Sequence, residues 1–273
     1  MELADTQAVE ALLRWYAEMG VEEAVTSEPM GLYAWKSTAE PQANADTSPR
    51  ARAKPTPAKT QIFRSESTPP SADEAIASAT KIAAACTSFE ELRAAVHTFE
   101  GCPLKAGARN TVFADGVASA KLLVIGEAPG RDEDQIGKPF VGRAGQLLDR
   151  MLAAIDRSRD QDTLITNVVY WRPPGNRTPT QIETAICQPF VDRLIELTDP
   201  KVIMLAGGAP LNALLGISGI MRARGIWREI ETQGGKRYPV LPMFHPAFLL
   251  RQPTNKRLAW NDLLTLNARL TED

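Results

Sequence analysis

The chain has 273 residues, of which 44% are hydrophobic, so it is long enough to bury a sizeable core. Its formal net charge of −2 gives no whole-chain signal for binding a polyanion, and no apolar run approaches the length of a membrane span. Three cysteines are too few for a disulfide framework and the N-terminus lacks the basic and apolar regions of a signal peptide, so we expect a soluble cytoplasmic protein with no membrane partner.

The first 72 residues differ in composition from the rest of the chain. Residues 5–26 carry apolar side chains at roughly helical spacing, which predicts a short amphipathic helix within an N-terminal segment, residues 1–35. Residues 36–72 are rich in Pro, Ala, Ser, Thr and charged residues, which predicts a disordered linker. We interpret this linker as a tether, with docking of residues 1–72 on a protein partner as the alternative. The folded domain is expected over residues 73–273.

From Ser71 onward, segments typical of strands alternate with segments typical of helices. Ser88 and Glu91 form a capping-box pattern, in which each satisfies the other's free amide, and this predicts a helix through Val96. The predicted strands are 121–126, 163–169, 201–207 and 239–244; the predicted helices are 144–155, 180–197, 211–215 and 255–270; and 225–238 is expected to form a hairpin or sheet edge. This alternation predicts an α/β fold, a single doubly wound domain with a central, mostly parallel four-stranded sheet flanked by helices.

Positive charge is concentrated in the C-terminal part of the chain. Residues 222–257 contain eight basic and two acidic side chains, a local charge of about +6 that favours a polyanion. A solvated surface with scattered Arg and Lys is the alternative interpretation.

Three of the predicted strands end in unusual polar sequence. These ends are GEAPG at 126–130, Asn167, and His245 followed by a proline. Because open parallel α/β sheets bind ligands at the carboxyl ends of their strands, we expect a site where these ends meet.

The three strand ends lie within longer motifs that point to one family. GEAPGRDEDQIGKPFVGRAGQLLDRML, TNVVYWRPPGNRTPT and FHPAFLLRQP resemble the motifs of the family-4 uracil-DNA glycosylases, over about residues 101–266. The resemblance implies a base-excision DNA repair enzyme that flips uracil out of DNA and hydrolyses its N-glycosidic bond, releasing free uracil and leaving an abasic site.

Within this resemblance, Asn167 matches the residue that reads the base and Phe140 matches the aromatic residue that stacks on it. The amide of Asn167 can accept from uracil N3–H and donate to O4, whereas cytosine presents the opposite pattern. A loop-capping Asn and a core Phe are the structural alternatives. The resemblance also places Gly126 and Ala128 beside the base.

The same resemblance suggests the catalytic residues. His245 is expected to donate a hydrogen bond to uracil O2, where negative charge develops as the base leaves. Ala128 stands where the family-1 enzymes have the Asp that positions water, so Glu127 is expected to stabilise the sugar cation or to orient water. Glu133 is expected to crowd the C5 position of the base and so exclude thymine.

Residues after His245 are expected to contact DNA. Leu249 or Leu250 would wedge into the base stack, and Arg251 would contact a phosphate. Packing of both leucines against the last helix is the alternative.

Family-4 enzymes usually hold a [4Fe–4S] cluster through four cysteines. Only Cys102 and Cys187 match those positions here, and Phe99 and Trp171 replace the other two. We therefore expect no cluster and no other metal, with the two aromatic rings filling the space by apolar burial.

Two functions other than hydrolysis of the glycosidic bond are alternatives for this chain. One is a uracil-DNA-binding protein that traps its substrate covalently with little turnover; that branch has an insertion with an extra histidine after the first motif, and no histidine lies between Gly130 and Phe140. The other is an interaction protein with an inert glycosylase fold, which the intact Asn167, Phe140 and His245 argue against. The sequence favours a monofunctional uracil-DNA glycosylase acting as a monomer on uracil-containing DNA.

Overall fold

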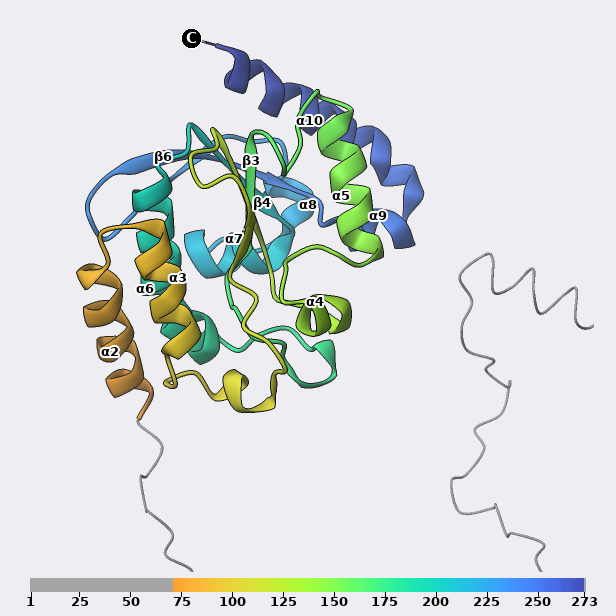
Figure 1. The fold of residues 1–273 in the computed structure, drawn as a ribbon. Helices are drawn as coiled ribbons and strands as arrows, with labels where there is room; N and C mark the ends of the chain where they lie inside the picture. Colours follow the sequence, from red (N-terminus) through yellow and green to blue (C-terminus); the bar gives the residue numbers. More distant parts are fainter. Residues whose placement is uncertain (1–70, 273) are drawn as a thin grey trace, which may run out of the picture. The chain divides into compact units, whose positions relative to one another are not determined.

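The computed structural model describes residues 71–272 of the chain (Figure 1). The helix expected over residues 5–26 of the N-terminal segment lies outside the described residues. So does the linker expected over 36–72, except for its last two residues. Ser71 caps the first described helix, α2 (Ala72–Ala85), through a capping box with Glu74.

A six-stranded sheet forms the centre of the fold, in the order β1-β3-β2-β4-β6-β5. The strands are β1 (Ala114–Gly116), β2 (Leu122–Gly126), β3 (Thr163–Asn167), β4 (Val202–Ala206), β5 (Arg228–Glu231) and β6 (Arg237–Met243). The four central strands, β3, β2, β4 and β6, run parallel to one another and correspond to the four that the sequence predicts. The predicted mostly parallel α/β architecture is confirmed.

The count of four strands was two short, because an antiparallel strand lies at each edge of the sheet. β5 lies within the segment expected to form a hairpin or edge. β1 has only three residues, Ala-Asp-Gly, and carries no apolar pattern that could have predicted it. It is a strand because it pairs with β3, not because of its composition.

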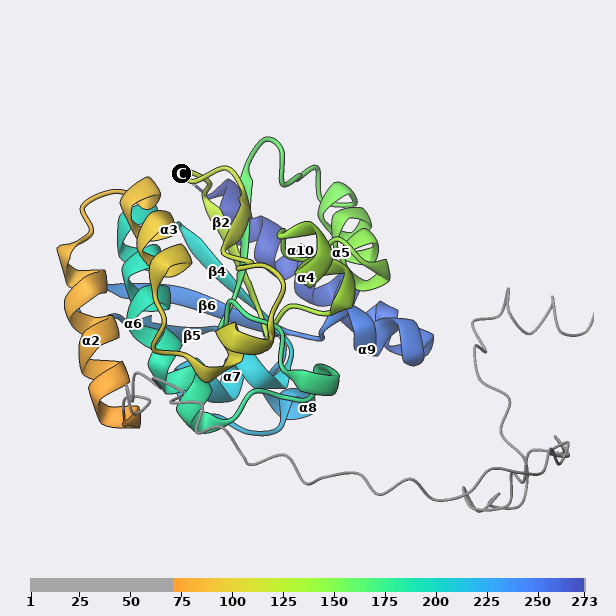
Figure 2. The same ribbon diagram turned by 60° about the horizontal axis from the view of Figure 1, so that its bottom comes forward.

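Helices cover both faces of the sheet (Figures 1 and 2). Successive residues of a strand point to opposite faces, so Leu123 and Ile125 of β2 belong to one buried cluster while Leu122 and Val124 belong to the other. The first cluster includes side chains of α2, α3 (Phe89–Thr98), α6 (Gln181–Thr198) and α7 (Gly208–Leu215). The second includes side chains of α5 (Arg143–Ala153), α9 (Pro246–Arg251) and α10 (Lys256–Thr271).

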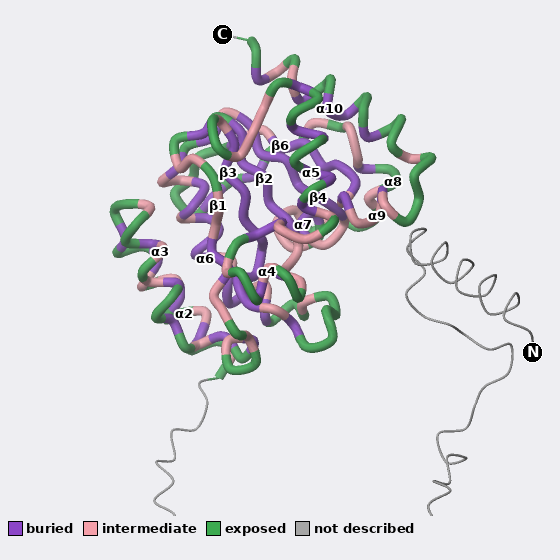
Figure 3. The backbone as a smooth tube through the Cα atoms, turned by 45° about the vertical axis from the view of Figure 1, so that its right-hand side comes forward, coloured by how far each residue is buried: buried purple, intermediate pink, exposed green. Residues whose placement is uncertain are grey.

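Short elements connect these layers: α4 (Arg131–Ile136), α8 (Ile220–Ala223), η1 (Pro103–Gly107), η2 (Pro174–Asn176) and η3 (Pro253–Asn255). The central strands are buried along most of their length, whereas the helices expose one side (Figure 3). Of the helices in residues 71–272, none has the length and apolar character needed to cross a bilayer.

The capping box predicted at Ser88 is only half formed. Ser88 Oγ accepts from the Glu91 N–H at 3.2 Å, so α3 begins where predicted. The Glu91 carboxylate accepts instead from the Thr87 N–H at 2.7 Å and from the Thr87 hydroxyl. The helix start was right and the reciprocal bond was wrong, because Thr87 offers the carboxylate two donors.

Candidate active site

The three polar strand ends meet at one cleft of about 360 Å³ at the carboxyl edge of the sheet. Glu127 follows β2, Asn167 ends β3, and His245 follows β6. Phe140 joins them from the loop between α4 and α5. The cleft is lined by Glu127, Ala128, Pro129, Gly130, Glu133, Phe140, Ala144, Asn167, Pro173, Asn176, Arg177, His245, Ala247 and Arg251.

Asn167 is 2% exposed, and within residues 71–272 its side-chain amide forms no hydrogen bond. It lies opposite Gly126 in the parallel pair of β3 and β2. A Cβ atom at Gly126 would lie 2.4 Å from Asn167 Oδ1 and 2.5 Å from the Phe140 ring, so only glycine fits there. The residue lines the cleft, so the donor and the acceptor of this amide are open to a ligand.

Phe140 presents its ring to the cleft from a left-handed backbone conformation, with φ of 53°. The ring stacks on the imidazole of His245, with centroids 5.5 Å apart and an interplanar angle of 28°. A flat aromatic surface and a hydrogen-bonding ring edge therefore face the same space.

His245 caps the N-terminus of α9, where its Nδ1 accepts from the Ala247 N–H at 3.1 Å. The pKa of His245 is lowered to about 4, chiefly by burial and then by the charge of Arg251, and Glu133 opposes both. The imidazole is therefore neutral at pH 7. Because Nδ1 accepts, the proton of the neutral ring lies on Nε2, which leaves a neutral donor for the cleft.

The two candidate carboxylates have different surroundings. Glu133 accepts from the N–H groups of Gly130 at 3.1 Å and of Val141 and Gly142 at 3.0 Å. Both of its oxygens are thus engaged by backbone, although its side chain lines the cleft. Glu127 forms no hydrogen bond or ion pair with any residue of the described part, and it also borders an adjoining hollow of about 350 Å³. Glu127 is the carboxylate free to face a reacting group.

The residues expected to contact DNA separate by burial. Leu249 is 1% exposed and packs in the second core cluster. This burial supports the alternative that Leu249 packs in the core, and not that it wedges into the base stack. Leu250 is half-buried and packs against the edge of the same cluster, and Arg251 is exposed and borders the cleft. Leu250 is left as the candidate wedge, with Arg251 beside the opening.

The local charge of residues 222–257 is lower than their composition indicates. Arg224 pairs with Asp262, and Lys236 pairs with Asp199, both acids lying outside the segment. Arg237 pairs with Glu231 within it. Folding brings distant acids to these basic residues, so the sequence count overstated the charge available to a polyanion.

The four positions that correspond to cluster ligands in the resemblance come together in the first core cluster. Phe99 and Trp171 have ring centroids 6.5 Å apart, and Phe99 packs edge-on against Phe190 at 5.0 Å. Trp171 is 1% exposed, and its Nε1–H donates to Thr111 Oγ1 at 3.0 Å. Two aromatic side chains thus lie where two thiolates would be needed.

The remaining two thiols, those of Cys102 and Cys187, are buried neighbours in the same cluster. This contact and complete burial raise the pKa of Cys187 well above its ordinary value, which opposes formation of a thiolate. Within residues 71–272 no group of three or more His, Cys, Asp or Glu side chains is arranged to hold a metal ion. These residues do not fit a four-thiolate cluster.

Pro173, Asn176 and Arg177 also line the cleft, although no role was predicted for them. They belong to the motif TNVVYWRPPGNRTPT, so the signal was in the sequence. Arg177 is fixed by two bonds to the Glu183 carboxylate, at 2.8 and 2.7 Å. The loop after β3 therefore forms a wall of the cleft.

The sequence model described as the Uracil DNA glycosylase superfamily matches residues 113–264. A type-4 uracil-DNA glycosylase of Thermotoga maritima is 38% identical over 164 residues, which cover 59% of this chain and 84% of the relative. The type-4 uracil-DNA glycosylase of Archaeoglobus fulgidus is 37% identical over 171 residues (61% and 85%). That of Sulfurisphaera tokodaii is 34% identical over 183 residues (64% and 81%).

Proposed function

The chain belongs to the uracil-DNA glycosylase superfamily and is a uracil-DNA glycosylase of DNA repair, and we propose that it flips uracil into the cleft between Asn167, Phe140 and His245 and hydrolyses its glycosidic bond there. The observation that carries the proposal is the amide of Asn167, which lines the cleft without a hydrogen bond to the described residues, beside the Phe140 ring and a neutral histidine.

Base recognition is proposed to rest on Asn167 and Phe140. The amide would accept from uracil N3–H and donate to O4, which satisfies a side chain that the described protein leaves without partners. Stacking on the Phe140 ring would contribute on the order of 1–3 kcal/mol. Gly126 and Ala128 would leave room for the base beside Asn167 and Phe140, because neither carries a long side chain.

Bond cleavage is proposed to rest on His245 and Glu127. As the N1–C1′ bond breaks, its electron pair passes to uracil, and the Nε2–H of His245 donates to O2 where the charge gathers. A neutral donor fits this task because its proton is present throughout the neutral pH range. The Glu127 carboxylate would stabilise the positive sugar and orient the water that attacks C1′; the water supplies hydroxyl to the sugar and a proton to uracil.

Glu133 is assigned a different task from the one expected from sequence. Its carboxylate already accepts three backbone N–H groups, so we propose that it shapes the loop that carries Phe140. Arg251 is proposed to contact a phosphate beside the cleft, and Leu250 to fill the space left by the flipped nucleotide.

We propose that the enzyme works without an iron–sulfur cluster. The four positions offer two thiols and two aromatic rings, and the whole chain has three cysteines, one fewer than a four-thiolate site needs. Packing of Phe99 and Trp171 would then stabilise the region that the cluster and its thiolate ligands hold together in cluster-containing enzymes.

Further proposals rest on the sequence. Residues 73–273 would be the catalytic unit, acting as a cytoplasmic monomer, in keeping with the three free thiols. Residues 1–35 and 36–72 would serve as a helical segment and a tether, with a protein partner as the alternative. Deletion of residues 1–70 should leave excision from short oligonucleotides nearly intact, and a large loss would show that these residues belong to the catalytic unit.

One assay tests the function. The full chain is incubated with an oligonucleotide containing one uracil, and alkali then cleaves any abasic site. Wild-type protein should yield the cleaved strand, and the same strand with thymine should stay intact. His245→Ala should abolish most cleavage, whereas His97→Ala, an exposed histidine on α3, should not. No cleavage by the wild type would refute the proposal, and a protein–DNA adduct on a denaturing gel would support the trapping alternative instead.

A further inference from the structure

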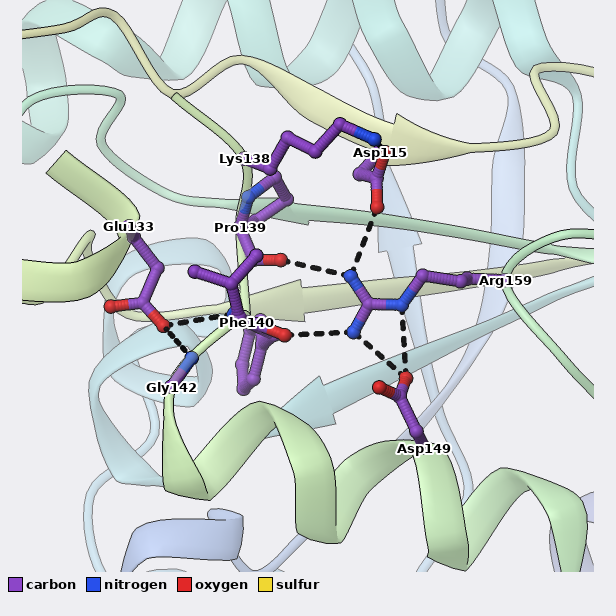
Figure 4. A network of polar contacts seen from close by, with 9 residues as sticks. Asp115, Glu133, Lys138, Pro139, Phe140, Gly142, Asp149 and Arg159 are labelled. Atoms are coloured by element: carbon purple, nitrogen blue, oxygen red, sulfur yellow. Dashed lines mark hydrogen bonds and ion pairs between the residues drawn. The ribbon is translucent and has the colours of Figure 1, made fainter. Parts of the chain in front are cut away.

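The loop that carries Phe140 is held by charged side chains, of which all but Glu133 lie outside the cleft (Figure 4). Phe140 has a φ of 53°, and bulky L residues rarely adopt this left-handed region because Cβ approaches the following carbonyl oxygen. Such a conformation persists only where the surrounding structure fixes it. The contacts around the loop show what fixes it.

Arg159, in the turn between α5 and β3, uses all five of its N–H groups. Nη1 donates to Pro139 O at 3.0 Å and Nη2 donates to Phe140 O at 2.8 Å. The remaining donors bind two carboxylates: Nη1 to Asp115 at 3.0 Å, and Nε and Nη2 to Asp149 at 2.9 and 2.8 Å. The side chain is 13% exposed, so little water competes for these bonds.

The two carbonyl groups belong to the peptide units on either side of Phe140. Because one planar guanidinium binds both, it fixes the angle between those peptide planes, which is set by φ and ψ of Phe140. Glu133 holds the other side of the loop through the N–H groups of Val141 and Gly142. Lys138 pairs with Asp115 at 2.9 Å, which ties the start of the loop to the same carboxylate.

The backbone of the loop also lies against α5. A Cβ atom at Gly145 would lie 1.8 Å from Phe140 O, so a glycine is required for the loop to approach the helix. At the other end of the residue, the Phe140 ring lies against Gly126 and stacks on His245. A change in φ or ψ of Phe140 would therefore move the ring relative to Asn167 and His245.

We propose that Arg159, oriented by Asp149 and Asp115, is a positioning residue that holds Phe140 in its left-handed conformation so that the ring is in place before the base arrives. The inference rests on the proposed stacking role of Phe140 and adds the residue that enforces it. Arg159 does not touch the cleft, so its effect on catalysis passes through Phe140.

A double-mutant cycle in the full chain tests the proposal. Single-turnover uracil excision is measured for the wild type, Arg159→Gln, Phe140→Ala and the double variant, with the folded fraction of each checked by circular dichroism. Arg159→Gln should slow excision about tenfold or more in the wild-type background, since small misplacements of a binding group cost that much. In the Phe140→Ala background it should change the rate less than about twofold, because coupled residues are not additive.

Arg157→Gln is the matched control. It lies in the same turn, its guanidinium binds Asp162 at 2.9 Å, and it makes no hydrogen bond to the Phe140 loop. Its rate should stay within about twofold of the wild type, since its side chain contacts neither the Phe140 loop nor the cleft. If Arg159→Gln does not fold, Asp149→Ala replaces it, because that change removes the acceptor of two N–H groups that orient the guanidinium while leaving the carbonyl contacts available.

The outcomes separate the inference from the function on which it rests. A wild type that releases no uracil refutes the proposed function itself. An active wild type in which Phe140→Ala has no effect, or in which Arg159→Gln acts by the same factor in both backgrounds, overturns the positioning role alone. A large effect of Arg159→Gln that disappears in Phe140→Ala supports it.

Discussion

The Phe140 ring and the His245 imidazole lie 5.5 Å apart at an angle of 28°. Because carbon atoms in contact lie about 3.5–4.0 Å apart, this spacing cannot admit a base between the two rings. A flipped base must therefore lie beside the imidazole, next to its edge and not under its face. Only the ring edge carries the Nε2–H, so the stacking geometry is compatible with the hydrogen-bonding role proposed for His245.

Asn167→Asp should weaken uracil excision about tenfold or more, because a carboxylate loses the donor to O4 and leaves a buried group mispaired. A protonated Asp offers a different pattern and should admit some cytosine. Single-turnover rates on matched uracil and cytosine oligonucleotides measure both effects. Asn261→Asp, an exposed change on α10, is the control and should retain the wild-type rate. Excision of uracil by Asn167→Asp at the wild-type rate would remove Asn167 from base recognition.

His245→Ala should fold and lose on the order of 10²–10³ in rate, the usual cost of one lost oxyanion donor. The pKa of about 4 adds a second expectation, that titration of this imidazole produces no step in the rate between pH 5.5 and 8. Nuclear magnetic resonance of the imidazole nitrogens measures the pKa directly, and His97→Gln assigns the two histidine signals. A His245 midpoint near 6.5 would contradict the buried, neutral donor.

The same pKa makes stability depend on pH. Between about pH 4 and pH 6.5 the unfolded chain binds a proton at His245 that the folded chain does not. The unfolding free energy should therefore decrease as the pH falls through this window, and His245→Ala should reduce that dependence in urea titrations at pH 5 and pH 7.

Trp171→Ala should destabilise the protein by roughly 3–5 kcal/mol, because a fully buried ring would leave a cavity. Cys102→Ser combined with Cys187→Ser should cost far less if neither thiol holds a cluster. Chemical denaturation compares the variants, and iron and sulfide analysis of anaerobically purified wild type accompanies it. Near-stoichiometric iron and sulfide, or a double serine variant that unfolds while Trp171→Ala stays folded, would refute the proposal that aromatic packing takes the place of the cluster.

Asp192 on α6 should make the protein less stable at alkaline pH. It is 5% exposed beside a hollow of about 290 Å³, and burial, followed by the charge of Glu196, raises its pKa to about 7. Between about pH 4 and pH 7 the folded chain holds a proton that the unfolded chain has released, so this contribution to stability is lost as the pH rises. Asp192→Asn should therefore stabilise the protein at pH 8, by at most about 4 kcal/mol at 1.4 kcal/mol per pKa unit, and change little at pH 5.

Thermal unfolding at the two pH values measures this difference. Asp160→Asn, an exposed change in the turn after α5, should affect both pH values equally. Equal stabilisation of Asp192→Asn at pH 5 and pH 8 would show that the Asp192 carboxyl is not buried in its neutral form.

Local patterns in the sequence determined the parts of this protein that local physics controls. Short apolar runs closed by polar or Gly-containing segments predicted the four central strands, and the topology of parallel sheets then placed Asn167 and His245 at one edge. Motif resemblance added Phe140 to the predicted site and identified Phe99 and Trp171 at two positions where cysteines were expected. The structure places Phe140 in the cleft with Asn167 and His245, and places Phe99 and Trp171 in one core cluster.

Only the tertiary structure decided the features that depend on contacts between distant residues. β1 forms because Ala114–Gly116 pairs with β3, and Leu249 is buried because α9 packs on the core. The charge of Lys236 is paired because folding brings Asp199 beside it. Arg159 donates hydrogen bonds to the carbonyl of Phe140, 19 residues earlier in the chain, and to Asp115, 44 residues earlier. No periodicity or composition encodes such pairs, since a hydrogen bond depends on position and angle to within a few tenths of an ångström, and these are set only once the sheet and its helices have packed.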